Sequence, residues 1–171
     1  SISDIHSNIY NKYEDDEVDY FVYTDGSCYN NGNDNAISGI GIYFSIDDKR
    51  NISELITDKT IKHTNNSAEL LAIIKCYEII QEDLKDKKIC IVTDSEYSIK
   101  CATSYGEKMA NENWKKNIPN KDLVEKIYKL NSNDNLKLKH VKAHTNNIDK
   151  HSLGNLYADN LAYQAIKNYI K

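Results

Sequence analysis

Four acidic residues, Asp25, Glu69, Asp94 and Asp159, are the side chains of this sequence most suited to chemistry. Hydrolysis of a phosphodiester by two metal ions needs several carboxylates around cations about 3.5–4 Å apart, where one cation activates water and the other stabilises the leaving oxygen. Mg²⁺ prefers oxygen ligands and keeps coordination positions open for water and phosphate. Four converging carboxylates without a cation would raise one another's pKa, so their convergence would indicate a metal site.

Taken one at a time, the same acids have ordinary structural explanations. Asp25-Gly26 is a common turn dipeptide, and Asp94 followed by Ser95 could simply cap the next helix. Glu69 and Asp159 could be solvated helix residues. The choice between chemistry and these explanations depends on the elements that carry the four acids.

The hydrophobic pattern predicts strands at 20–29, 36–46, 52–63, 88–93 and 135–141, and helices at 65–81, 95–101, 119–130 and 155–170. This order predicts an α/β fold: a five-stranded mixed sheet whose first three strands are antiparallel, with helices packed on both faces. The later strands would join through helices and run parallel to the first strand. Asp25 and Asp94 both come late in their strands. They are expected to converge where such sheets bind ligands, beyond the carboxyl ends of parallel strands.

The N-terminal residues differ in composition from the rest of the chain. Residues 1–18 are polar and acidic without sustained periodicity, so we expect a flexible acidic arm at 1–18 and one catalytic domain at 19–171. Residues 1–19 hold six acids and one lysine, a charge of −5, whereas the whole chain carries −4. The remainder therefore carries +1, and cations bound by the four acids would raise this to +5, which suits a polyanionic partner.

Other site classes find little support. The four cysteines include no C-x-x-C pair, which argues against a zinc ribbon and favours reduced structural thiols. His140, His144 and His151 fall on a predicted strand end and loop, where no regular element fixes a zinc-binding spacing. Neither a membrane span nor a signal peptide is readable, so we expect an intracellular protein, cytoplasmic or nuclear, with no membrane partner.

Five motifs occur in an order, spacing and element type that closely resemble the type 1 ribonuclease H family. The resemblance covers residues 20 to about 165. The motifs are Tyr23-Thr24-Asp25-Gly26-Ser27, Thr64-Asn65-Asn66-Ser67-Ala68-Glu69, Thr93-Asp94-Ser95, His140-Val141-Lys142-Ala143-His144 and Gly154-Asn155-Leu156-Tyr157-Ala158-Asp159.

The resemblance implies an endonuclease that hydrolyses the RNA strand of an RNA:DNA hybrid and leaves 5′-phosphate and 3′-hydroxyl ends. It implies that the four acids bind two Mg²⁺ ions, for which Mn²⁺ can substitute. The family's loop histidine, matched here by His144, would assist proton transfer or product departure. Residues 145–153 make the interval before Asp159 longer than in many bacterial members, so His151 stays open as an alternative.

The resemblance also implies contacts with the RNA strand. Residues that sense the RNA 2′-hydroxyls match Asn31, Asn65 and Asn66. An amide suits this task because it can both donate a hydrogen bond to a hydroxyl and accept one from it.

Contacts with the DNA strand are implied at two further places. A phosphate pocket of some members matches Thr64 and Asn120, with Lys62 where an arginine is often found. Trp114, Lys115 and Lys116 resemble part of the family's basic protrusion, which packs along the DNA backbone. The alternative for this segment is a buried tryptophan beside solvated lysines.

Three other interpretations stay open at this point. An integrase, transposase or junction resolvase would need the acids but not the asparagines that suit 2′-hydroxyls. A catalytically silent hybrid-binding domain would have lost an acid, and none is lost. The chain could also be the ribonuclease H portion of a reverse transcriptase or another larger protein. No obligate protein partner is readable, so a monomeric domain is expected.

Overall fold

The computed structural model describes residues 10–170. Its five strands form one sheet in the order β3-β2-β1-β4-β5. Strands β1, β2 and β3 are antiparallel neighbours, whereas β1, β4 and β5 run parallel, which confirms the predicted mixed sheet. The elements are β1 (Tyr20–Tyr29), β2 (Ile37–Tyr43), β3 (Ile52–Ile56), α2 (Asn65–Ile80), β4 (Ile89–Thr93), α3 (Glu96–Ala102), α4 (Ser104–Asn111), α5 (Lys121–Leu130), β5 (Leu136–His140) and α6 (Lys150–Ile170), with short 3-10 helices at Asp15–Glu17 and Asp83–Lys85.

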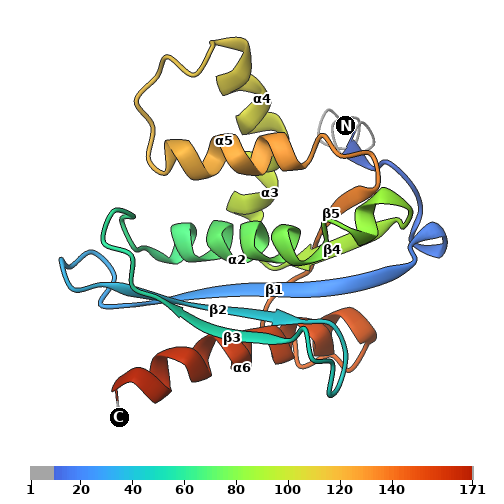
Figure 1. The fold of residues 1–171 in the computed structure, drawn as a ribbon, viewed down its shortest axis with the longest axis horizontal. Coiled ribbons are helices and arrows are strands. Elements are labelled where there is room, and N and C mark those ends of the chain that lie inside the picture. Colours follow the sequence, from blue (N-terminus) through green and yellow to red (C-terminus); the bar gives the residue numbers. More distant parts are fainter. Residues whose placement is uncertain (1–9, 171) are drawn as a thin grey trace.

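Helices cover both faces of this sheet (Figure 1). Helix α2 lies on β1 and β2, with α3 and α5 beyond it, while α6 crosses β1, β2 and β3 on the opposite face. Strand β4 serves both layers because its side chains alternate: Ile89 and Ile91 enter the core beneath α2, and Cys90 and Val92 enter the core on the α6 side. All four are fully buried, as expected for a central parallel strand.

Glycines on β2 allow α6 to lie directly on the sheet. A β-carbon on Gly41 would lie 2.0 Å from the carbonyl oxygen of Ala158, and one on Gly39 would lie 2.4 Å from that of Ala162. Any side chain at either position would therefore push the helix away from the strands. The position of α6 matters because this helix carries Asp159.

The prediction that residues 1–18 form a flexible arm outside the fold is wrong for residues 10–18, and residues 1–9 lie outside the described part of the chain. We call residues 10–18 the N-terminal strap. Tyr13 is buried, and its hydroxyl donates to the carbonyl oxygens of Ile89 (2.8 Å) and Asn135 (2.9 Å). The strap thus packs where β4 and β5 begin, a region of the sheet that α6 leaves largely uncovered.

A lysine adds to this anchorage. The Lys12 ammonium donates to the backbone carbonyl oxygens of Asn131, Asn133 and Leu136 at 2.5, 2.7 and 2.6 Å. Burial lowers the pKa of Lys12 to about 8. Polar contacts with distant backbone atoms leave no hydrophobic periodicity in the sequence. The sequence pattern therefore predicts a flexible arm where the structure has an ordered strap.

The bounds of β3 and α6 differ from the prediction. Strand β3 ends at Ile56 rather than residue 63, because the Asp58 carboxylate accepts from the Thr60 amide (2.9 Å) and turns the chain. Helix α6 begins at Lys150 rather than residue 155. Here the Asp149 carboxylate accepts from the Ser152 amide at 3.2 Å, as an N-terminal cap does.

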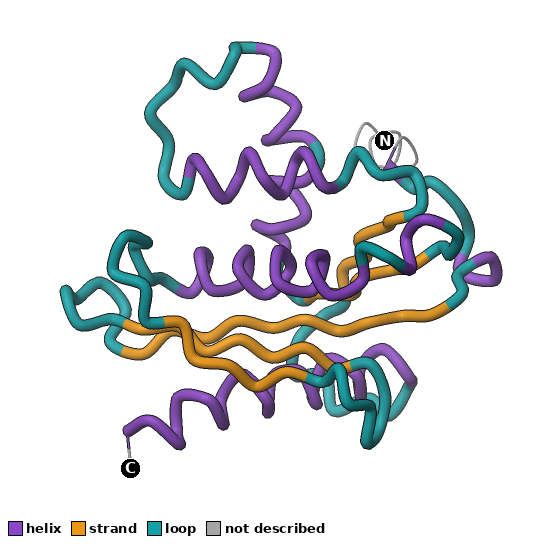
Figure 2. The backbone as a smooth tube through the Cα atoms, viewed as in Figure 1, coloured by secondary structure: helices purple, strands orange, loops and turns teal. Residues whose placement is uncertain are grey.

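The region between β4 and β5 contains one helix more than predicted. Helix α4 follows α3 directly and buries Gly106 and Met109. Helix α5 begins at Lys121 instead of residue 119, because Asn120 takes a left-handed backbone conformation just before it. Figure 2 shows these helices stacked above α2, against which α5 packs. Within residues 10–170, no helix combines the length and hydropathy needed to cross a membrane.

Candidate active site

The four predicted acids meet in one open pocket of about 360 Å³, which we call the acidic pocket. They reach it from four elements: β1, α2, the bend after β4, and α6. The convergence of strand-borne and helix-borne carboxylates expected from the sequence is therefore found. The pocket is lined by Asp25, Gly26, Ser27, Asn65, Asn66, Glu69, Asp94, Ser95, Glu96, Tyr97, His144 and Asp159.

Asp25 and Glu69 come together because β1 and α2 touch through Gly26. A β-carbon at Gly26 would lie 2.2 Å from the carbonyl carbon of Ala68 and 2.4 Å from the amide nitrogen of Glu69. The Gly26 amide donates to the Glu69 carboxylate at 2.5 Å. Asp25-Gly26 is thus not a turn: both residues pair with β2 inside the sheet, and the glycine permits the close approach of the helix.

Asp94 is left free for the pocket because its neighbour caps the next helix. The Ser95 hydroxyl, not the Asp94 carboxylate, accepts from the Ser98 amide (3.1 Å) and starts α3. The same arrangement starts α2, where Thr64 accepts from the amide of Ser67 at 3.0 Å. The capping explanation considered for Asp94 is therefore wrong.

The electrostatics of the pocket favour a cation. Carboxylate oxygens of Asp25, Glu69 and Asp94 lie within 4.8 Å of one another. Burial, then the charges of Glu69 and Asp94, raises the pKa of Asp25, with a further contribution from Asp159. The pKa of Glu69 is raised by burial and by Asp94. No lysine or arginine is among the residues that line the pocket. An oxygen-rich set of this kind fits a hard divalent cation.

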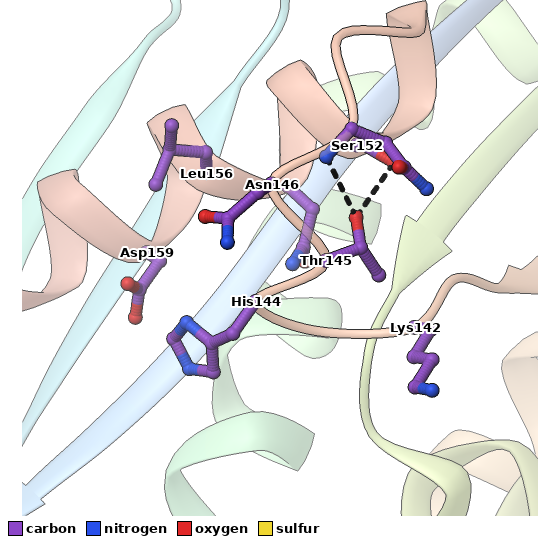
Figure 3. Close-up of a pocket in the computed structure, with 9 residues that line it drawn as sticks. Lys142, His144, Thr145, Asn146, Ser152, Leu156 and Asp159 are labelled. Carbon is purple, nitrogen blue, oxygen red and sulfur yellow. Dashed lines mark hydrogen bonds between the residues drawn. The ribbon is translucent and has the colours of Figure 1, made fainter.

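His144 lines the acidic pocket beside Asp159, and it also lines a smaller neighbouring pocket of about 110 Å³. Figure 3 shows the imidazole and the Asp159 carboxylate on the same side of the loop. Thr145 ties this loop to α6, because its hydroxyl donates to Ser152 at 3.4 Å and accepts from the Asn147 amide at 3.3 Å. The loop before α6 thus brings His144 to the acids.

His151, the alternative to His144, lies elsewhere. Its Nδ1 is 2.9 Å from the Tyr23 hydroxyl, its ring centroid is 4.6 Å from that of Phe21, and its Nε2 is 3.9 Å from the Asp15 carboxylate. It therefore packs between the sheet and the N-terminal strap. It is not among the residues that line the acidic pocket.

The predicted RNA-strand residues are placed in two groups. Asn65 and Asn66 are exposed at the start of α2 and line the acidic pocket, so their amides face the same space as the acids. Asn31 is exposed in the turn between β1 and β2, outside that lining.

The predicted phosphate-pocket residues are dispersed. Lys62 is exposed and lines a different pocket, together with Lys59 and the β1–β2 turn. The Thr64 hydroxyl is engaged as the cap of α2. The Asn120 amide donates to the Tyr97 hydroxyl at 3.3 Å, which brings it close to the acidic pocket through Tyr97.

The predicted protrusion is only partly available to a ligand. Trp114 packs against the core and meets Tyr128 edge-on, with ring centroids 6.2 Å apart. Lys115 and Lys116 are exposed, and the Lys116 ammonium lies 3.6 Å from the Glu112 carboxylate. The half-buried tryptophan agrees with the alternative of a packed Trp114, and the exposed lysines remain available for contact with a DNA strand.

Reasoning from sequence missed three residues of this site. Glu96 and Tyr97 line the pocket from the first turn of α3. Asn155 is buried on α6, and its amide nitrogen donates to the Asp94 carboxylate at 3.2 Å. The available signal for Asn155 was its spacing, since it precedes Asp159 by four residues and so shares a helix face with it.

Comparison with known proteins agrees with this geometry. The RNase H family model matches residues 17–167. A ribonuclease H of Schizosaccharomyces pombe is 39% identical over 150 residues, which cover 82% of this chain and 50% of the relative. A probable ribonuclease H of Acanthamoeba polyphaga mimivirus is 36% identical over 146 residues, covering 82% of this chain and 63% of the relative. The chain thus spans half to two thirds of the length of these two relatives.

Solved structures share the fold. A ribonuclease H1 isolated from compost, solved in complex with an RNA/DNA hybrid, matches with a TM-score of 0.58 and 22% identity, covering 88% of this chain and 99% of that chain. A prototype foamy virus protease-reverse transcriptase matches with a TM-score of 0.68 and 23% identity, over 86% of this chain and 21% of that chain. With its fold, its acids and a family model spanning nearly all of its sequence, this chain belongs to the ribonuclease H family.

Proposed function

We propose that this chain is an endoribonuclease that hydrolyses the RNA strand of RNA:DNA hybrids and leaves 5′-phosphate and 3′-hydroxyl ends. One observation carries the proposal: four acids from four elements line a single open pocket together with two asparagines at the start of α2. The curated relatives named ribonuclease H and the family model support the same activity.

The donor set fits two Mg²⁺ ions, with Mn²⁺ as a substitute. Asp25, Glu69 and Asp94 offer oxygens close enough to share one cation, and Asp159 lines the same open pocket from the other side of the sheet. When bound, the ions would supply a nucleophilic water and stabilise charge on the leaving oxygen. The openness of the pocket to solvent leaves room for the scissile phosphate.

The chain's own side chains would select and process the substrate. Asn65 and Asn66 would donate to and accept from RNA 2′-hydroxyls, which a DNA strand lacks at the same positions. His144 would exchange a proton near the scissile phosphate or assist departure of the product, because an imidazole can both donate and accept a proton. Contacts with the DNA strand would come from Lys62, Thr64, Asn120, Trp114, Lys115 and Lys116. Asn31 would add a contact with the RNA strand.

A cleavage assay with end-labelled duplexes tests the proposal. In Mg²⁺, we expect cutting of the RNA strand of an RNA:DNA hybrid and none of double-stranded DNA, double-stranded RNA or single-stranded RNA. The Asp25→Asn variant serves as the matched control for contaminating nuclease. Equal cutting of double-stranded DNA by the wild-type protein would contradict the proposal and favour an enzyme that acts on DNA.

A further inference from the structure

Asn155 occupies an unusual position on α6. Its side chain is 5% exposed, and its amide nitrogen donates to the Asp94 carboxylate oxygen Oδ2 at 3.2 Å. Its carbonyl oxygen is buried and has no hydrogen-bond partner among the described residues. One helical turn later, the same helix face carries Asp159 into the acidic pocket.

Fold stability alone does not explain an asparagine at this position. Asparagine is a weak helix former, and a buried carbonyl oxygen without a partner costs free energy. The neighbouring buried positions of α6 that face the sheet are small and apolar: Gly154, Ala158 and Ala162. An alanine at position 155 would avoid both costs, and what it would lose is the hydrogen bond to Asp94, so the asparagine points to that contact.

The orientation of the amide is fixed by chemistry. An ionised carboxylate can only accept hydrogen bonds, so the NH₂ group of Asn155, not its carbonyl oxygen, must face Asp94. Asp94 itself lies in the bend between β4 and α3, outside any regular element. A donor on a rigid helix can therefore limit the rotation of a carboxylate that its own backbone leaves less restrained.

Close packing of α6 makes this contact possible. Gly154 lies on the ring of Tyr23, where a β-carbon would come within 2.5 Å of three ring carbons. The absence of a side chain lets the second turn of α6 approach the sheet, and Asn155 then reaches across to the end of β4. The same helix thus supplies one acid and holds another.

We propose that Asn155 is a positioning residue that orients the Asp94 carboxylate for cation binding and couples it to the helix that carries Asp159. This inference rests on the proposed function of the acidic pocket. Residues that hydrogen-bond to metal ligands typically change metal affinity or activity by about 10- to 100-fold when they are removed.

The test compares Asn155→Ala and Asn155→Asp with the wild-type protein. For Asn155→Ala we expect about 10- to 100-fold lower kcat at limiting Mg²⁺, a matching rise in the Mg²⁺ concentration for half-maximal activity, and a KM for hybrid within about two-fold. Asn155→Asp should lose more, because an acceptor replaces the donor and adds a like charge beside Asp94. Calorimetric titration of Mg²⁺ without substrate should show weaker binding by both variants.

Asn131 provides a matched control. It is also buried, and its amide nitrogen donates to the Ala102 carbonyl oxygen at 3.1 Å, away from the acidic pocket. Asn131→Ala should lower the unfolding temperature by about 2–4 °C without a change in Mg²⁺ dependence. Asn155→Ala should behave in the opposite way, with an unchanged or higher unfolding temperature and weaker Mg²⁺ binding.

The outcomes separate this inference from the proposed function. Unchanged Mg²⁺ affinity and unchanged Mg²⁺ dependence in both Asn155 variants would overturn the positioning role, whatever the wild type cuts. Failure of the wild type to cut a hybrid, with weaker Mg²⁺ binding by Asn155→Ala, would overturn the proposed substrate and leave the positioning role standing. An Asn155→Ala variant that only loses thermal stability would show a structural role instead.

Discussion

Asp15 and Asp25 are two carboxylates of one small domain in opposite surroundings. Asp15, on the N-terminal strap, accepts from the ammonium groups of Lys139 at 2.6 Å and Lys137 at 3.4 Å, and the hydrogen bond from Lys139 is the first cause that lowers its pKa. Asp25, in the acidic pocket, has no basic partner there, and burial beside Glu69 raises its pKa. The difference shows that neighbours, and not the local density of acids, decide what a carboxylate does.

The sequence gives the opposite impression. The dense run of acids lies at residues 14–19, yet the acid of that run with paired lysines serves the fold, and the pocket is built from acids far apart in the chain. The Asp15 carboxylate, paired with two lysines, stabilises the contact between strap and sheet. The carboxylates of the acidic pocket have no such lysines among the pocket's lining residues, and this favours a bound cation.

The largest effect is expected from removing charge in the acidic pocket. Asp25→Asn or Asp94→Asn should lower kcat by several powers of ten in Mg²⁺, because activation of water depends on the bound cations. Hybrid binding should persist, since loss of a negative charge reduces repulsion of phosphate. Single-turnover cleavage and filter binding measure the two effects. Asp15→Asn is the matched control and should keep kcat within about two-fold, and wild-type rates for either pocket variant would place the active site elsewhere.

The two histidines near the start of α6 should differ almost as strongly. His144→Ala should lower kcat by roughly 10- to 10,000-fold with little change in KM, the range for assistance by a general acid or base. His151→Ala should leave kcat nearly unchanged, because His151 contacts Tyr23, Phe21 and the strap instead of the acidic pocket. Steady-state kinetics of both variants decide the matter, and the reverse pattern would reject the assignment of His144.

Anchorage of the strap should be visible as stability. Lys12→Met removes an ammonium that donates to three carbonyl oxygens and should lower the free energy of unfolding by about 2–4 kcal/mol. Lys85→Met is the control, since the Lys85 ammonium makes an exposed contact with Glu82 and its removal should leave stability nearly unchanged. Urea denaturation measures both, and equal small changes would mean that the strap is loosely held.

The pH dependence of stability should have opposite signs in the two regions of the metal-free protein. The folded-state pKa of Asp25 is raised, so this residue favours the fold below its unfolded pKa and opposes it as pH rises. Asp25→Asn should therefore raise the unfolding temperature in a chelator at pH 7, by about 4 °C or more, and lose this advantage near pH 4 and below.

Asp15 should show the reverse behaviour. Its folded-state pKa is lowered, so its contribution is present above the unfolded pKa and is lost as pH falls through the folded pKa. Asp15→Asn should lower the unfolding temperature slightly at pH 7, and this difference should shrink as pH falls through the folded pKa; the effect is small because the carboxylate is 41% exposed. Thermal scans across pH measure both variants, and shifts of the same sign would refute the contrast.

Much of the fold followed from the sequence because its elements bury one periodic face. The bounds predicted for β1 and β4 agree closely with the structure: β1 covers Tyr20–Tyr29 and is followed by Asn30, and β4 is a short buried apolar run that is followed by Asp94. The four acids were identified through the order of five motifs rather than through any single one. The strands were readable from short stretches of sequence, whereas the acids needed the motifs along the whole chain.

What the sequence concealed depends on contacts between distant residues. Lys12 of the strap donates to backbone carbonyls more than 100 residues away, and Asn155 reaches Asp94 across 61 residues. The start of α6 depended on one capping contact of Asp149, which a loop composition also explains. None of these contacts changes a hydrophobic period, so each needs the folded chain to be seen.

The close contact at Gly26 has a consequence for how this site would look in a mutational survey. Every substitution there would drive a side chain into the backbone of α2, so a selection for activity would reject changes at Gly26 as severely as changes at Asp25. A map of intolerant positions would mark both residues alike, although only one carries a reactive group. Abundance of folded protein, scored beside activity, would separate them: Gly26 variants would disappear from the cell, whereas Asp25 variants would accumulate as inert protein.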